Sequence, residues 1–269
     1  ESMEILKDPS SLAIFGVRGA NGVIIITTKK AKEGQTLVNI NTSFGFKKVV
    51  DKVKLVNGSQ FKELYNEQLA NQGDDPFDYT GWDANTDWQD EIFQTAFITN
   101  NNISITGASP KHSFYLGVGY SYEQGNIEHE KFSKVTINAS NDYKITDFLK
   151  VGFQFNGARM LPADSKQVLN ALRATPIAPV YNNEYGLYTA LPEFQKAQIN
   201  NPMVDVELKA NTTKAENYRA SGNIYGEVDF LKHFTFKAMF SMDYASNNGR
   251  TYTPIVKVYD AAVNGGIST

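Results

Sequence analysis

The sequence predicts a mainly β protein, in which antiparallel strands of a transmembrane β-barrel follow a small N-terminal domain. Segments of alternating apolar and polar residues recur from residue 36 onward, as in strands that have one apolar and one polar face. The connections between these segments alternate between long and short along the chain. The first 35 residues lack the alternation and contain a continuous apolar run instead.

The apolar run extends from Val23 to Thr28, follows the glycine-rich turn at 19–22, and ends in lysines. A run without alternation is typical of a strand that is buried on both faces. Upstream, residues 2–16 form a short amphipathic segment that Pro9 interrupts, because proline disfavours helix at the residue before it. We interpret residues 1–35 as the end of a small inner domain whose last strand is the apolar run.

Seven strands are expected after residue 36. In the first, Val38, Ile40, Phe44 and Phe46 lie on one side, and Asn39, Asn41, Ser43 and Gly45 lie on the other. The same alternation recurs in six later segments, around residues 101–107, 113–122, 134–140, 149–156, 218–230 and 234–244.

The connections between the expected strands favour a membrane barrel. The links after the first, third and fifth strands are long or exposed (47–99, 124–131 and 160–216), whereas the links after the second, fourth and sixth are tight (108–111, 144–147 and 231–233). Outer-membrane barrels have short turns on one side and long loops on the other. A soluble all-β sandwich, the alternative architecture, has no reason to separate its connections in this way.

The long loops are expected to contain two helices. Apolar residues fall on one helical face in 60–72, with Ser59 as the predicted N-cap and Gly73 as the C-terminal stop. A shorter helix is expected from Trp88 towards Thr95.

Composition limits the function classes. The net charge of −3 and pI of about 5.7 give no electrostatic case for nucleic-acid binding. No run of about 18 apolar residues predicts a membrane-spanning helix. The absence of cysteine removes thiol catalysis and thiolate metal sites. His112, His129 and His233 are far apart, and no paired nucleophile or acid/base spacing is present, so no enzyme activity is predicted.

The acidic aromatic loop 74–87 holds the candidate ligand-binding residues. Residues 83–87 begin like a calcium-binding loop, but Trp88 replaces the turn glycine and Gln94 replaces the bidentate glutamate, so no metal site of that type is expected. A looser calcium site remains an alternative to a solvated acidic loop. Aromatic rings beside carboxylates can stack on sugars and bond their hydroxyls, although such rings also pack loops. The residues concerned are Asp74, Asp75 and Asp78 for calcium, Tyr79, Trp82 and Trp88 for a ligand, and Asp83 for either.

The turn before the apolar run carries two polar side chains, Arg18 and Asn21. A phosphate-binding loop would precede a helix, whereas this turn precedes a strand. We therefore expect both residues to tie the inner domain to the barrel wall rather than to bind a substrate.

The stretch MEILKDPSSLAIFGVRGANGVIIITTKK, residues 3–30, resembles the end of the plug domain of SusC/RagA-type TonB-dependent outer-membrane transporters. Residues 87–93 and 148–152 also resemble the family. The resemblance implies a fragment in which residues 1–35 are the C-terminal part of an α/β plug. Residues 36–269 would then be the N-terminal part of the barrel, with extracellular loops 47–99 and 160–216.

The resemblance also implies a function. It predicts active import of oligosaccharides or peptides across the outer membrane of a Gram-negative bacterium. TonB would drive it through an N-terminal box absent from these residues, with a SusD-like surface lipoprotein as partner. Apart from the alternative of a calcium site in loop 74–87, the residues themselves predict no cofactor. The alternative is a soluble all-β carbohydrate-binding or adhesion module.

Overall fold

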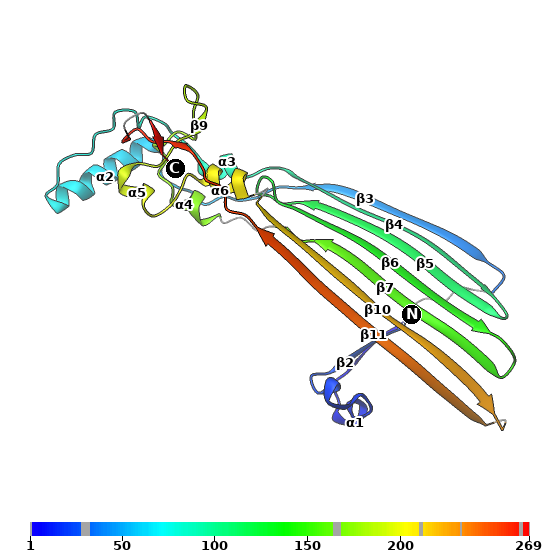
Figure 1. The fold of residues 1–269 in the computed structure, drawn as a ribbon. Helices are drawn as coiled ribbons and strands as arrows, with labels where there is room; N and C mark the ends of the chain where they lie inside the picture. Colours follow the sequence, from blue (N-terminus) through cyan, green and yellow to red (C-terminus); the bar gives the residue numbers. More distant parts are fainter. Residues whose placement is uncertain are drawn as a thin grey trace.

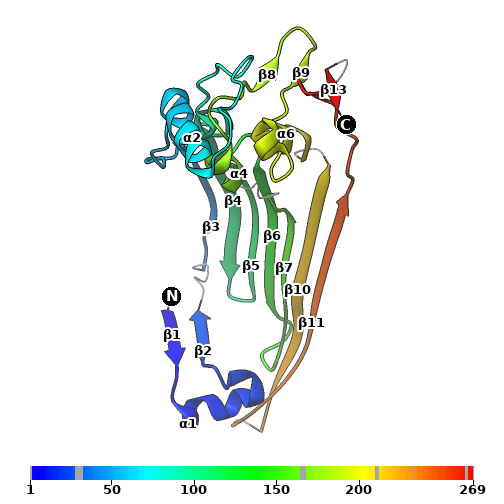
Figure 2. The same cartoon turned by 90° about the vertical axis from the view of Figure 1, so that its left-hand side faces the viewer.

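The computed structural model describes residues 2–27, 33–163, 168–209, 212–231, 233–263 and 266–268. A large antiparallel sheet occupies the middle of the molecule, and its long connections gather at one end (Figures 1 and 2). We call these gathered connections, with residues 252–268, the cap. The small N-terminal unit lies toward the other end of the sheet, where the tight turns are (Figure 2).

The N-terminal unit is a hairpin with short helices at its tip. Strand β1 (Ser2–Leu6) pairs antiparallel with β2 (Val23–Thr27). Between them lie α1 (Pro9–Leu12), which is N-capped by Asp8, and the 3₁₀ segment η1 (Ala13–Gly19). The predicted strand is therefore present, but the expected burial of both its faces is wrong for the described residues, because Ile24 is 60% exposed and β1 is the one neighbour of β2. Thr28 and the lysines that follow it lie outside the described residues.

The sheet contains the seven predicted strands in chain order, each antiparallel to the next. The sheet is not closed, and β3 and β11 form its two edges within the described residues. The strands are β3 (Thr36–Lys47), β4 (Ala96–Ser109), β5 (His112–Gln124), β6 (Lys131–Lys144), β7 (Leu149–Leu161), β10 (Thr213–Phe230) and β11 (Phe234–Thr251). The predicted mainly β, antiparallel fold class is confirmed.

Several strands extend further toward the cap than the alternation indicated. β7 continues to Leu161, β10 begins at Thr213, and β11 continues to Thr251. The register of β10 and β11 runs without a break to the pair Thr213 and Thr251. In the extensions of β10 and β11 polar residues occupy both faces, so hydrophobic periodicity gives no signal there although the backbone ladder is complete.

The cap consists of short elements from the two long connections and from the C-terminal segment. The first connection supplies α2 (Gly58–Gln72) and α3 (Trp88–Ile92). The second supplies α4 (Leu169–Arg173), β8 (Tyr181–Asn182), β9 (Leu187–Tyr188), α5 (Glu193–Lys196) and α6 (Pro202–Lys209). The C-terminal segment adds β12 (Val258–Tyr259) and β13 (Ile267–Ser268). None of the described helices is long and apolar enough to cross a membrane.

The two predicted cap helices are present, with one correction. The N-cap of α2 is Asn57 and not Ser59, because Asn57 and Gln60 form a reciprocal capping box while Ser59 lies inside the first turn. Gly73 ends the helix in the left-handed conformation, with φ of 80°, as predicted.

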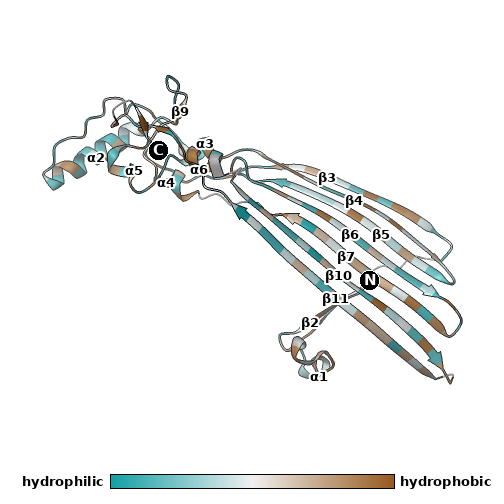
Figure 3. Cartoon of the chain, in the orientation of Figure 1, coloured by the Kyte–Doolittle hydropathy of each residue, from teal (hydrophilic) through white to brown (hydrophobic). Residues whose placement is uncertain are grey.

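The hydrophobic core lies in the cap and not in the sheet. Its buried residues come from both long connections and from the β5–β6 turn: Trp88, Ile92, Ile127, Ala171, Ala174, Ala178, Leu191, Ile199, Met203 and Val206. By contrast, apolar and polar residues alternate along every long strand, and most of the large apolar side chains there are exposed (Figure 3).

Candidate functional site

The register of the sheet collects the apolar side chains on one face. Ile40, Ile103, Val118 and Ile137 occupy one row across four neighbouring strands. Ile40 on β3 is 68% exposed, and Phe240, on the same face of β11, is 66% exposed. We call this face, which continues through Phe153, Phe155 and Ile224, the apolar face. An exposed apolar surface of this extent needs a non-aqueous neighbour.

The opposite face of the sheet is polar and rich in amides and hydroxyls. One row across it runs through all seven strands as Asn39, Ser104, Gly117, Asn138, Asn156, Ser221 and Asp243. Gly117 and Gly119 on this face are buried, while Val118 between them is exposed on the other. Because a curled sheet crowds the side chains on its concave side, we infer that the polar face is the concave one, and we call it the polar wall.

A charged cluster around Tyr225 marks the tight-turn half of the polar wall. The Tyr225 hydroxyl donates a hydrogen bond to Asp142 on β6. The ammonium groups of Lys150 and Lys237 lie 5.6 and 4.4 Å from the centre of the Tyr225 ring, and Lys237 also pairs with Glu227 at 3.6 Å. A tyrosine ring flanked by two lysines and a carboxylate can bind both planar apolar and charged groups.

Tyr225 is not among the residues that the sequence predicts for a site. The odd positions of β10 around it are mostly polar, with Asn223 before it and Glu227 after it. The available signal was an aromatic residue among the polar positions of an alternating strand. A search for hydrophobic periodicity counts such a residue only as a break in the pattern.

In the cap, the predicted ligand residue Trp88 is buried. It is only 2% exposed, and its indole N–H donates a 2.9 Å hydrogen bond to the Thr175 carbonyl of the second connection. Trp82 is half-buried and packs against the same core, and its backbone N–H donates to the Tyr79 carbonyl at 2.8 Å. The Trp88 ring therefore joins the two connections and offers almost no surface to a ligand.

The ring of Tyr79 belongs to a second aromatic cluster, on the side of α2. Its members are Phe61, Tyr65, Phe77, Tyr79 and Phe194, with neighbouring ring centres 4.5–6.0 Å apart. The Tyr79 hydroxyl donates to Asn66 at 2.9 Å, and Lys62 lies over the ring. Burial, with a smaller contribution from Tyr65, raises the pKa of the Tyr79 phenol.

The four predicted ligand residues thus do not form one site within the described residues. Tyr79 packs on α2, Trp82 and Trp88 pack on the cap core, and Asp83 is exposed. A cavity of about 720 Å³ beside α2 includes Phe61, Trp88 and Arg173 in its wall, but not Tyr79, Trp82 or Asp83. Ligand binding by Tyr79, Trp82, Asp83 and Trp88 stays a prediction.

The carboxylates of the 74–87 loop serve local structure. Asp78 accepts hydrogen bonds from the backbone N–H and the hydroxyl of Thr80, which hold the pKa of its carboxyl below the usual range. Asp87 caps α3. In the part of the chain that the structure describes, the cluster with metal-ligand spacing lies elsewhere, at Glu128, His129 and Glu207, where His129 pairs with Glu207 at 3.0 Å. Calcium binding by the loop stays a prediction.

Contact of Arg18 and Asn21 with the barrel wall stays a prediction. Asn21 is exposed in the turn before β2, and the side chain of Arg18 lies outside the described part of the chain. The division of the chain into a plug part, 1–35, and a barrel part, 36–269, likewise stays a prediction.

Comparisons with known proteins agree on one family. No protein-family model matches the chain. It is 30% identical to the TonB-dependent receptor P3 of Formosa agariphila over 98% of its length, and 29% identical to the TonB-dependent receptor SusC of Bacteroides thetaiotaomicron, also over 98%. These matches cover 26% and 28% of the two receptors, so the chain spans about a quarter of their length.

Solved structures show the same fold. The chain superposes with a TM-score of 0.74 on the RagAB peptide importer in its "open-open" and "closed-closed" states, at 20% and 22% identity. Each match covers 93% of this chain and 32% of that chain. By sequence over nearly its whole length, and by the fold of its sheet and cap, this chain is homologous to a segment of the SusC/RagA-type TonB-dependent receptors.

Proposed function

We propose that the protein imports oligosaccharides or peptides across the outer membrane by TonB-dependent transport, together with a SusD-like surface lipoprotein. In this proposal residues 36–251 form part of the barrel wall, the N-terminal unit is part of the plug, and the cap faces the outside of the cell. The polar wall then lines the path of the substrate, whose hydroxyl or amide groups the asparagine and serine side chains can bond.

The observation that carries the proposal is that the two faces of the sheet differ in polarity and its two ends differ in the length of their connections. One face is apolar and exposed from β3 to β11, the other is polar, and all long connections fold together at one end. A membrane barrel requires this combination, because lipid contacts the outer face and loops can be long only on the surface side.

The alternative of a soluble β module is disfavoured by the same observation. A soluble sandwich would cover its apolar face with a second sheet. In the described residues the buried core lies in the cap, and side chains such as Phe236 and Met242 remain exposed. The relatives are receptors, which also supports a function without catalysis.

The test uses the complete protein in its native host. The gene is deleted, and growth is compared on glycan mixtures and on peptide mixtures as the limiting nutrient, with simple sugars and amino acids as the control. We expect a defect on one polymer class, restored by the wild-type gene and abolished again when TonB is absent. Unchanged growth on both classes, or uptake that does not need TonB, contradicts the proposal.

The partner is tested by affinity purification from outer membranes. Replacing α2 with a short glycine linker should release a co-purifying surface lipoprotein, because α2 projects from the cap (Figure 1). A short insertion after Asp147 is the matched control, since its exposed turn lies at the opposite end of the sheet. Equal loss of the lipoprotein in both variants contradicts a partner site on the cap.

A further inference from the structure

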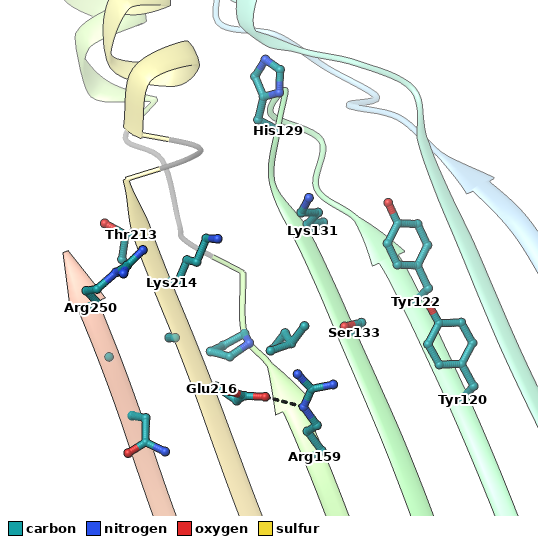
Figure 4. A pocket seen from close by; sticks show the side chains of 15 residues that line it. Tyr120, Tyr122, His129, Lys131, Ser133, Arg159, Thr213, Lys214, Glu216 and Arg250 are labelled. Carbon is teal, nitrogen blue, oxygen red and sulfur yellow. Dashed lines mark hydrogen bonds and ion pairs between the residues drawn. The ribbon is translucent and has the colours of Figure 1, made fainter. Parts of the chain in front are cut away.

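A hollow of about 650 Å³ lies on the apolar face at its cap end, lined by residues from β5, β6, β7, β10 and β11 (Figure 4). Lys131 is four residues from Val135, and Lys214 is four residues from Tyr218. Even spacing along a strand keeps a side chain on the same face. The cations of this hollow therefore lie on the same side of the sheet as the exposed apolar residues, but nearer the cap.

The charge of the hollow is opposite to that of the chain. Its lining includes the cations Lys131, Arg159, Lys214 and Arg250 and the carboxylate of Glu216, whereas the whole chain carries a net charge of −3. Arg159 pairs with Glu216, so the net positive charge of the hollow comes from Lys131, Lys214 and Arg250 (Figure 4). His129, at the edge of the hollow, pairs with Glu207 of α6.

Two of these cations are placed where they repel each other. Lys214 and Arg250 are direct cross-strand partners in the β10–β11 ladder. Like charges at opposed positions destabilise a sheet. An anion bound between them would remove this repulsion and would convert the pair into a binding site.

Tyrosines lie between the exposed apolar side chains of the apolar face and the cations of the hollow. Tyr120 and Tyr218 occupy the same row as Arg159, and Tyr122 lies one row nearer the cap. Aromatic residues at this depth are typical of the boundary between hydrocarbon and headgroups. The order along the sheet is thus apolar side chains, then tyrosines, then cations.

We propose that this hollow binds the phosphate groups of a phosphorylated lipid in the outer leaflet of the membrane. The acyl chains lie against Val135 and Ile137, which are exposed on the same face of β6, and the phosphates contact Lys131, Lys214 and Arg250. The inference rests on the proposed outer-membrane location, since the apolar face must contact lipid for a headgroup to reach the cations. A soluble anion would need no exposed apolar surface beside the site.

The test measures binding of bisphosphorylated lipid A to the complete protein, purified from outer membranes and delipidated in detergent. In the triple variant Lys131→Gln, Lys214→Gln and Arg250→Gln, we expect affinity to fall about tenfold, since each exposed charge pair contributes modestly. The matched control is Lys134→Gln, Lys144→Gln and Arg219→Gln, which removes three charges from strands β6 and β10 on the polar wall. We expect the control to bind as the wild type does.

A second measurement uses thermal stability and does not depend on the triple variant folding well. Lys214→Gln should raise the melting temperature in lipid-free detergent, because it removes the repulsion from Arg250. In the presence of lipid A the same change should lower the melting temperature relative to wild type. A change of the same sign in both conditions overturns the proposal.

Three further outcomes also overturn it. They are equal binding of lipid A and of lipid A without phosphates, displacement of lipid A by millimolar inorganic phosphate, and equal loss in the test and control triples. If one of these outcomes is found for a protein that lies in the outer membrane and imports its substrate, only the lipid-binding inference fails. If the protein is found outside the outer membrane, the proposed function fails with it.

Discussion

The indole N–H of Trp88 and the carbonyl oxygen of Thr175 are 2.9 Å apart, and this hydrogen bond joins the two long connections of the sheet. Ala171, Ala174 and Met203 belong to the same buried cluster as the ring. The cap is therefore a packed unit and not a pair of independent loops, so changes in one connection are transmitted to the other.

Trp88→Ala should open the cap, with a cost of about 3–5 kcal/mol from the lost ring and the cavity it leaves. Trp88→Phe keeps much of the apolar area but leaves the Thr175 carbonyl without its donor, which costs about 1–3 kcal/mol. Hydrogen exchange of residues 168–178 in the complete protein measures both effects. Trp82→Ala, at the margin of the core, is the milder control. Lost substrate affinity with unchanged exchange would show instead that Trp88 binds ligand.

Charges on the two faces of the sheet should have unequal effects. Leu116→Arg and Phe240→Arg place a cation on the apolar face and should cost about 2–4 kcal/mol near mid-depth. Ser121→Arg and Ser241→Arg are on the same strands but on the polar wall, and they should be tolerated. Folding of the complete protein into lipid vesicles gives the comparison. Equal tolerance on both faces would contradict the barrel assignment.

Residues 1–269 expressed alone should not form a stable monomeric membrane protein. In the described sheet, β3 and β11 each have one neighbour, so each presents a row of unpaired backbone groups. Lipid cannot satisfy such groups, and an open edge pairs with other chains. Sedimentation with and without detergent is the measurement. A soluble monomer with a cooperative thermal transition would falsify this expectation and would favour the binding-module alternative.

Gly22→Val should damage the N-terminal unit without affecting the sheet. Gly22 has φ of +101°, and a Cβ there would lie 3.3 Å from the carbonyl oxygen of Leu6. A β-branched residue in this conformation costs about 1–3 kcal/mol. Protease sensitivity of residues 2–27 reports on the unit, and heat-dependent gel mobility reports on the barrel. Gly45→Val is the control, because its Cβ would meet open space at an ordinary φ.

Alkaline pH should loosen the C-terminal segment from the cap. Lys196 contacts Glu193 at 2.5 Å and Asp260 at 2.9 Å, and these bonds raise its pKa above the usual 10.5. A raised pKa in the folded state means that the stabilisation is complete below pH 10.5 and is lost as pH rises through the folded pKa. Hydrogen exchange of residues 257–263 between pH 8 and 11.5, corrected for intrinsic rates, should show this change. In Lys196→Gln the segment should be loose across the whole range, and a transition that persists there must belong to another group.

The alternation of side chains determined the seven strands and their order of connection. Val38 and Ile40 on β3, or Phe236 and Phe240 on β11, have the period that a strand between lipid and a polar interior requires, and turn lengths fixed which strands are neighbours. Periodicity could not give the ends of the strands near the cap. Near the cap, polar residues occupy both faces of these strands, such as Lys214 on one face and Asn217 on the other, so only the backbone ladder places them.

The loops show what only the tertiary structure decided. Tyr79, Trp82, Asp83 and Trp88 are close in sequence, and their side chains could equally have formed a ligand site or a packed loop. The Thr175 carbonyl, 87 residues further along the chain, accepts the hydrogen bond of the Trp88 indole N–H. Phe194 joins the aromatic cluster that includes Tyr79. These partners lie in another connection, so no local pattern identifies them. Likewise, the repulsion between Lys214 and Arg250 exists only in the register of β10 and β11, which tertiary pairing sets.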